Sequence, residues 1–209
     1  MTQESSRGVH ANADASSRWI EPVGKLRYLA LAALCIAIDL ASKWWAFEVV
    51  EMTQRRGDPW PRHEVIPGFF DLVRMENPGA VGGLGGDFPW LLVSLRLAAV
   101  AALIFGLLRV ARVRWFLLTA LALVLGGAVG NLYDNLAFAE ESAPGKVRDF
   151  LSFDLSGIGI REFPGLVHGG HFNAFNFADA CIVCGAISLV LLSFAPAPRA
   201  SAGPSTPGT

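Results

Sequence analysis

Four long apolar stretches dominate the chain, at residues 28–47, 88–108, 115–138 and 172–195. An α-helix needs about 20 mainly apolar residues to cross the hydrocarbon core of a bilayer. Each of the four stretches reaches that length. The pattern therefore predicts a mainly α integral membrane protein with four transmembrane helices.

The two long links between these stretches contain strand patterns. Apolar and polar side chains alternate after Phe70 in the segment E-V-I-P-G-F-F-D-L-V-R-M-E of residues 64–76, which is typical of a strand. A second short strand is predicted at V-R-D-F-L-S-F, residues 147–153. The segment that follows, residues 154–170, is rich in glycine and polar residues, and we expect it to be mobile.

Basic residues near the helix ends predict the orientation of the protein. The short link at residues 109–114 contains three arginines and no acidic residue, and three more basic residues lie within 18–27. In the two long links, acidic residues outnumber basic ones. Because lysine and arginine are enriched in cytoplasmic loops, both termini are expected in the cytoplasm and both long links outside.

The composition agrees with a membrane protein. Of the 209 residues 53% are hydrophobic and only 17% are charged, whereas soluble domains carry about 25% charged residues. The net charge of −1 lacks the basic footprint of nucleic-acid binding, so no nucleic-acid partner is expected. We assign residues 25–195 to one membrane domain and expect the polar tails, 1–24 and 196–209, to be disordered cytoplasmic segments.

The three cysteines, Cys35, Cys181 and Cys184, all lie in apolar runs. An odd number of cysteines outside polar loops argues against a disulfide framework. Free cysteine behaves as a small hydrophobic residue, so we interpret all three as packing residues.

Polar side chains within the apolar stretches are the main functional signal, because ionisable groups in hydrocarbon are costly and mark functional sites. They are Asp39, Lys43, Arg96, Asn131, Asp134, Asn176 and Asp179. At about 1.5 Å per residue, Asp39 and Arg96 are expected about 12 Å, and Asp179 about 10 Å, from the outer helix ends. The groups are thus predicted to line one polar cleft in the outer half of the membrane. The alternative is that such residues only hold helices together.

Paired carboxyl groups offer a specific chemistry. Two carboxyls held close together share a proton, so that one can deprotonate a water molecule while the other protonates a carbonyl oxygen. This is metal-free peptide hydrolysis by an aspartic mechanism. The candidates are Asp134, Asp149, Asp154 and Asp179, and their spacing alone does not select the pair.

Other chemistries have weaker support. His168 and His171, together with Asp149 or Glu162, could bind a metal, but the helical H-E-x-x-H pattern is absent. No G-x-S-x-G elbow or phosphate-binding loop is present. A proton-coupled carrier that uses the buried acids is a further alternative, although four helices without an internal repeat do not favour it. We expect neither a metal nor another cofactor.

Five segments, in order, resemble those of lipoprotein signal peptidase, the bacterial signal peptidase II. They are I-D-L-A-S-K-W-W (residues 38–45), G-F-F-D-L-V-R-M-E-N-P-G-A (68–80), G-G-A-V-G-N-L-Y-D (126–134), V-R-D-F (147–150) and F-N-F-A-D (175–179). Each motif alone is weak, but the ordered set extends over about residues 28–195.

The resemblance implies a four-helix aspartic peptidase of the bacterial inner membrane, with a small extracytoplasmic β-cradle near which the active site lies. Such a peptidase cleaves prolipoproteins just before the diacylglyceryl-modified cysteine. It is expected to need no cofactor, to act as a monomer and to contact membrane lipids. The resemblance assigns catalysis to Asp149 and Asp179. It assigns substrate binding or support of the site to Asp39, Lys43, Asn77, Gly79, Asn131, Asp134 and Asn176.

The chain departs from the family pattern at two places that bear on the site. The family's Asp-Arg pair is Asp134-Asn135 here, and the links around Asp149 are longer than usual. One hypothesis is that Arg96 replaces the missing arginine by reaching the acids from the second helix. The other is that Arg96 pairs with Asp39. The missing arginine also leaves a non-catalytic, lipoprotein-binding relative as the alternative function.

Overall fold

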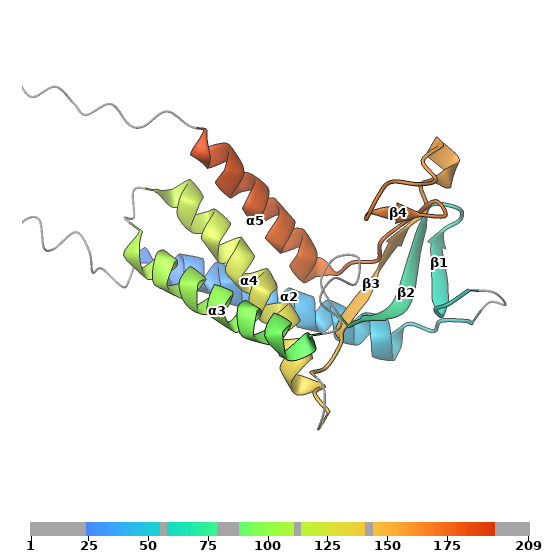
Figure 1. The fold of residues 1–209 in the computed structure, drawn as a ribbon, viewed down its shortest axis with the longest axis horizontal. Helices are drawn as coiled ribbons and strands as arrows, with labels where there is room; N and C mark the ends of the chain where they lie inside the picture. The colour runs from blue at the N-terminus through green and yellow to red at the C-terminus, as the bar shows by residue number, and fades with distance from the viewer. Residues whose placement is uncertain (1–23, 55–57, 79–87, 111–113, 141–143, 195–209) are drawn as a thin grey trace, which may run out of the picture.

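The computed structural model describes residues 24–54, 58–78, 88–110, 114–140 and 144–194. The predicted disordered tails and Gly79 lie outside these residues. Within them, four helices lie side by side and a small β-region lies beyond one end of the helices (Figure 1). The start of α2, the end of α3, the start of α4 and the end of α5 lie at the other end (Figure 1).

Three of the described helices are long and apolar enough to cross a membrane. They are α2 (Leu26–Trp44), α3 (Pro89–Arg109) and α4 (Trp115–Ala137), and α2 continues into a five-residue π-helix at Trp45–Val49. Their bounds match the predicted stretches to within a few residues.

The fourth apolar helix, α5, is shorter than predicted and spans Phe177–Ser193. The expected start at residue 172 is wrong, because Asn176 caps the helix. The side chain of Asn176 accepts a hydrogen bond from the backbone N–H of Asp179, and the Asp179 carboxylate accepts one from the Asn176 N–H. Such a capping box fixes a helix start whatever the hydropathy of the preceding residues.

Helix α4 packs against all three other helices, and its glycines permit the close approach. A Cβ at Gly126 would lie 2.6 Å from the Cβ of Cys35 in α2, and one at Gly127 would meet the backbone oxygen of Ala178 in α5. At Gly130 the added atom would collide with the Asp39 carboxylate. The G-G-x-x-G run therefore brings α2 and α5 against one polar region of α4.

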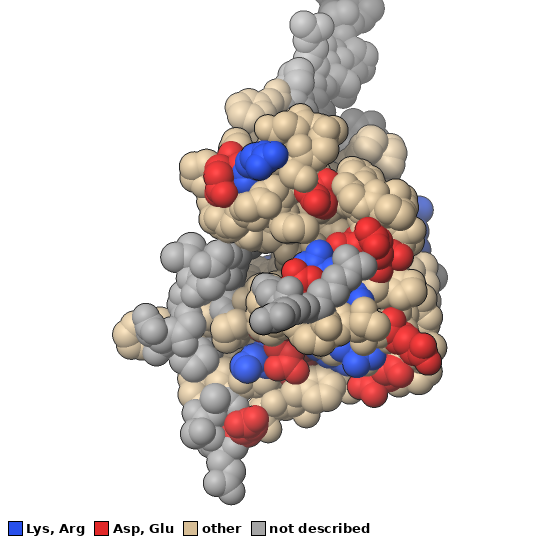
Figure 2. All heavy atoms as spheres, turned by 90° about the vertical axis from the view of Figure 1, so that its right-hand side faces the viewer, with Lys and Arg blue, Asp and Glu red and all other residues tan. Residues whose placement is uncertain are grey.

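Apolar side chains cover much of the outer surface of the helices. Leu95, Phe105, Ile187 and Leu191 are all exposed, and the buried cluster at the end away from the sheet is small. Exposed apolar faces on every helix are typical of a surface in contact with lipid. By contrast, acidic and basic side chains are interspersed over the end that carries the β-region (Figure 2).

Both predicted strands are present in a three-stranded antiparallel sheet of the described residues. Its order is β1 (Arg62–Ile66), β2 (Phe70–Asn77) and β3 (Val147–Phe153). The β2–β3 register shifts between Leu72 and Met75, which places Met75 opposite Asp149. Ala46, in the π-helix, packs with Leu72 and Phe150, so an apolar cluster joins the sheet to the end of α2.

The glycine-rich segment after β3, expected to be mobile, has regular structure. A 3-10 turn at Ser156–Ile158 precedes a small hairpin of β4 (Val167–His168) and β5 (His171–Phe172). The two residues between the strands, Gly169 and Gly170, have φ angles of 58° and 88°. A tight two-residue hairpin turn requires positive φ at both central positions, and glycine provides it without steric cost.

Candidate active site

Asp149 lies in the middle of β3 and its side chain is almost fully buried, at 1% exposure. Two amides donate to its carboxylate. The Nδ2 of Asn77 lies 3.1 Å from Oδ2, and the Nδ2 of Asn176 lies 2.7 Å from Oδ1. The sheet register supplies Asn77, because it pairs with Val147 on the adjacent strand. Asp149 is thus held by residues from β2 and from the cap of α5.

Burial and a neighbouring charge both change the acidity of Asp149. Removal from water raises its pKa, the negative charge of Asp179 raises it further, and the two amide donors lower it. The net effect raises the pKa of Asp149 to about 7. A carboxyl group with this pKa can carry a proton at neutral pH and still release it during a reaction.

Asp179 is the third residue of α5 and lies in its first turn. The predicted start at residue 172 would have placed it about two turns into the helix. Its Oδ1 accepts a hydrogen bond from Asn131 Nδ2 at 2.8 Å, and its Oδ2 accepts one from the backbone N–H of Asn176 at 3.2 Å. The positive end of a helix dipole favours a negative charge in the first turn. Asp179 is thus held by Asn131 of α4 and by the cap of α5.

Asn176 connects the two acids. Its Nδ2 group donates to Asp149 and, at 3.1 Å, to the Oδ1 of Asn131, while its backbone N–H donates to Asp179. The backbone of Phe175, the preceding residue, hydrogen-bonds with Leu151 of β3 in both directions. Because the strand and the helix cap are fixed to each other at this point, the two carboxyl groups are held facing the same region.

Lys43 supports this arrangement from α2, where it is fully buried. Its ammonium group lies 2.7 Å from the Oδ2 of Asp39 and 3.1 Å from the Oδ2 of Asp134, and it donates to Asn131 Oδ1 at 2.9 Å. The other oxygen of Asp39 accepts the backbone N–H of Ala178 at 2.9 Å. One buried cation therefore ties α2 to α4, and its acidic partner ties α2 to α5.

Known proteins resemble this chain over most of its length. The model of the family described as signal peptidase (SPase) II matches residues 31–195. The chain belongs to the signal peptidase II family.

Several curated relatives are named lipoprotein signal peptidase. The protein of Oleidesulfovibrio alaskensis is 36% identical over 77% of this chain and 90% of its own length. That of Pseudomonas fluorescens is 36% identical over 82% and 89%, and that of Bifidobacterium adolescentis is 33% identical over 80% and 75%. A solved bacterial membrane enzyme, 22% identical, covers 80% of this chain and 87% of its own with a TM-score of 0.61, which shows a shared fold.

Sequence reasoning missed one residue of the site, Arg148. Its guanidinium group contacts Asp134 Oδ1 at 2.7 Å, and its backbone N–H donates to Asp134 Oδ2 at 3.1 Å. The guanidinium also stacks over the ring of Phe138, 4.6 Å from the centroid. The only available signal was that Asp134 lacks the arginine that follows it in the family. A cation from β3 occupies that role for Asp134 in this chain.

Arg96 reaches the site from α3, in agreement with the hypothesis that it replaces the missing family arginine. Its guanidinium donates to the Oδ1 of Asn135, the residue in place of the family arginine, and it interacts electrostatically with Asp179 and Asp149. Asp39, the partner in the other hypothesis, is paired with Lys43.

The remaining candidate acid, Asp154, lies just beyond the end of β3. Its Oδ1 accepts the backbone N–H of Ser156 at 2.8 Å, which stabilises the turn there. Hydrogen bonding to the side chain of Ser156, together with this backbone hydrogen bond, lowers the pKa of Asp154. Asp154 therefore has a structural environment that keeps it ionised, in contrast to Asp149.

Proposed function

We propose that Asp149 and Asp179 are the catalytic acids of this peptidase. As a member of the signal peptidase II family, the protein is a membrane aspartic endopeptidase that removes signal peptides from prolipoproteins. The observation that carries the assignment is the position of Asn176, which binds both carboxyl groups at once. Asp134, the other acid nearby, is saturated by Lys43 and Arg148.

The contacts of the two acids suggest distinct roles. Asp179 accepts a proton from a water molecule whose oxygen attacks the scissile carbonyl carbon. Asp149, with its pKa of about 7, donates a proton to the carbonyl oxygen. When the tetrahedral intermediate collapses, the C–N bond breaks and Asp179 gives its proton to the leaving amine. Asp149 takes back a proton from a hydroxyl group of the intermediate as the carbonyl re-forms. The amine belongs to the lipidated cysteine that becomes the new N-terminus.

The supporting residues hold the two catalytic carboxyl groups in position. Asn77 and Asn176 fix the Asp149 carboxyl, and Asn131 fixes Asp179. Lys43 holds Asn131 and thereby extends this support to α2. Asp39, Asp134 and Arg96 complete the charge balance around the site. Gly79 belongs to the same proposal on the strength of the motif alone.

The membrane arrangement is the second part of the proposal. Helix α5 joins α2, α3 and α4 as the fourth transmembrane helix, and residues 25–195 form one domain. The sheet and hairpin form the extracytoplasmic cradle, and both termini lie in the cytoplasm. The apolar helix faces support their placement in the bilayer, and the charged surface of the β-end supports its placement outside the bilayer (Figure 2). The peptidase is proposed to work as a monomer, with no nucleic-acid partner.

The substrate is proposed to be a diacylglyceryl-modified prolipoprotein. Its acyl chains and signal-peptide helix enter sideways from the bilayer and lie against the exposed apolar faces of the helices. The non-catalytic alternative has no support, because both acids are in place and the relatives cited above are named as peptidases.

Cleavage in a reconstituted system tests the assignment. The wild-type protein and the Asp149→Asn and Asp179→Asn variants are incubated with a diacylated prolipoprotein, and products are separated on a gel. We expect cleavage by the wild type only, with both variants folded as judged by their thermal unfolding. Asp154→Asn is the matched control, and it should still cleave. Substantial cleavage by either of the first two variants would contradict the proposal.

A further inference from the structure

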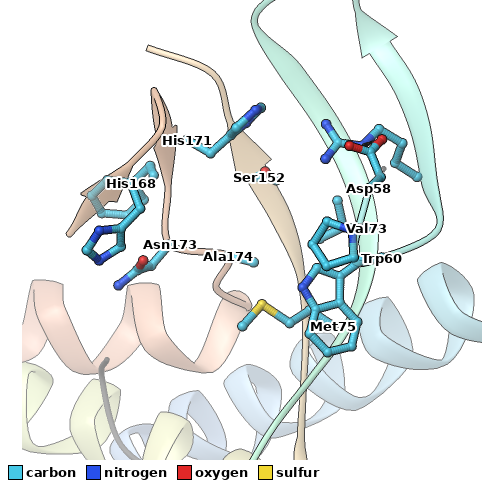
Figure 3. Close-up of a pocket in the computed structure, with 12 residues that line it drawn as sticks. Asp58, Trp60, Val73, Met75, Ser152, His168, His171, Asn173 and Ala174 are labelled. Atoms are coloured by element: carbon cyan, nitrogen blue, oxygen red, sulfur yellow. Dashed lines mark ion pairs between the residues drawn. The ribbon is translucent and has the colours of Figure 1, made fainter. Parts of the chain in front are cut away.

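A pocket outside the pair of acids is bounded by the hairpin on one side and by the sheet on the other (Figure 3). Its volume is about 300 Å³. The residues that form its apolar part are Pro59, Trp60, Val73, Met75, Phe172 and Ala174. Its polar lining includes Ser152 from β3 and, from the hairpin and the residue after it, His168, His171 and Asn173.

The pocket adjoins the catalytic acids through the backbone. Met75, on β2, is the cross-strand partner of Asp149, and Ala174 precedes Asn176 by two residues. Opposite residues of an antiparallel pair lie about 5 Å apart at their Cα atoms. An extended chain advances about 3.3 Å per residue. A peptide held at Asp149 therefore reaches this pocket within about two or three residues.

The charges at the pocket disfavour an acidic occupant. Arg62 is the arginine in the lining, and it is paired with two carboxylates, Asp58 at 3.0 Å and Asp71 at 2.8 Å, so the three groups together are not positive. The indole of Trp60 is partly exposed, and it lies beside Met75 on the lower side of the pocket in Figure 3. Removal of an apolar side chain from water into this pocket is favourable. An acidic side chain would find Arg62 already paired with two carboxylates.

The position of the pocket also determines which part of the substrate can reach it. The signal-peptide helix and the acyl chains lie in the bilayer, beside the apolar helix faces. The strands and the hairpin that line the pocket lie beside one end of the group of helices (Figure 1). The part of the substrate that extends away from the membrane is the mature protein, which begins at the lipidated cysteine.

We propose that this pocket binds an apolar side chain from the first few residues after the lipidated cysteine, and so makes the peptidase selective for the mature end of its substrates. This inference rests on the proposed function, because the pocket is reached from the peptide bound at Asp149. The hairpin is central to it, since β4, β5 and Asn173 form one wall. The side chain of Asn173 donates to the backbone oxygen of Gly165 at 2.8 Å and holds that wall closed.

The test is a competition between matched substrates. Diacylated prolipopeptides with the same signal sequence carry serine or leucine at each of the three positions after the lipidated cysteine. The ratio of kcat/KM for leucine over serine is measured for the wild type at each position. We expect a ratio of about ten or more at one position, the value for burial of one apolar side chain. The ratio is insensitive to the amount of folded enzyme, because both substrates are cleaved by the same sample.

Two variants change the pocket in opposite ways. Ala174→Phe fills it and Trp60→Ala removes part of its lining, and each should reduce the ratio to about one. The matched control is Ile158→Phe, an exposed residue of the 3-10 turn that is not part of the lining, and it should keep the wild-type ratio.

The outcomes separate the two proposals. A wild-type ratio near one at all three positions, or a ratio that survives both pocket variants, overturns the pocket while cleavage itself upholds the catalytic assignment. A wild-type protein that cleaves no substrate overturns the proposed function and the pocket together.

Discussion

The Asn77 amide lowers the pKa of Asp149, so a substitution that removes this amide should raise that pKa. Catalysis as proposed requires Asp149 to be protonated, so activity falls as the pH rises through its pKa of about 7. The Asn77 amide donates to the carboxylate at 3.1 Å and stabilises the ionised form. An Asn77→Leu change removes this donor, which raises the pKa and moves the alkaline limb of the activity profile to higher pH.

The size of the shift follows from the hydrogen bond. A hydrogen bond to a charged group is worth about 1.5–3 kcal/mol, and one pKa unit corresponds to about 1.4 kcal/mol. The alkaline limb should therefore move from near pH 7 in the wild type to about pH 8 to 9 in the variant. The activity on the acidic plateau should fall as well, because the carboxyl group is less well positioned.

The assay is kcat/KM as a function of pH for cleavage of a diacylated prolipopeptide, since this parameter reports on the free enzyme. Thr119→Val is the control. It removes a side-chain hydrogen bond to the Trp115 oxygen on α4, remote from the acids, and should leave the limb at its wild-type pH. A limb that stays near pH 7 in Asn77→Leu, or moves to lower pH, would refute the reasoning.

Three further substitutions test the support of the site. Lys43→Met leaves Asp39 and Asp134 buried without their shared cation and should cost about 3–5 kcal/mol in the free energy of unfolding, measured by denaturant titration in detergent; wild-type stability would contradict the network. Gly130→Ala should destabilise the protein in the same titration despite the higher helix propensity of alanine, because the added methyl group meets the Asp39 carboxylate; a more stable variant would show that the helices have room. Arg148→Gln should lower kcat about tenfold or more with little change in KM, with partial rescue by Arg148→Lys; a change confined to KM would assign Arg148 to substrate binding instead.

Hydropathy alone predicted the bounds of three helices to within a few residues, but it did not predict the start of the fourth. Phe172 and Phe175 extend the predicted apolar stretch, but they pack against each other, and Phe175 stacks with Phe153 of β3. What ends the strand and starts the helix is the reciprocal hydrogen bonding of Asn176 and Asp179. The motif N-x-x-D could have indicated that cap, and with it the position of Asp179 in the first turn.

The choice between Asp149 and Asp154 could not be made from spacing. Asp149 lies in β3 and Asp154 lies just beyond its end, so the two acids are close in sequence. They differ in their hydrogen-bond partners: Asn77 and Asn176 donate to Asp149, whereas Asp154 accepts from a local turn. The role of Arg148 was hidden for the same reason, since its partner Asp134 is 14 residues away on a different element. The hairpin was also missed, because its residues were assigned to a mobile segment and to the start of the fourth helix. Two consecutive glycines between two histidines are nevertheless typical of a tight turn.

The capping of α5 has a consequence for biogenesis. Asp39 receives the Ala178 N–H, and Asn131 receives the Asn176 amide, only when α5 has packed against α2 and α4. A nascent chain that has folded only α2, α3 and α4 therefore carries polar groups with incomplete partners. It also holds Asp149 without Asp179, so on the proposed assignment an unfinished chain is inert.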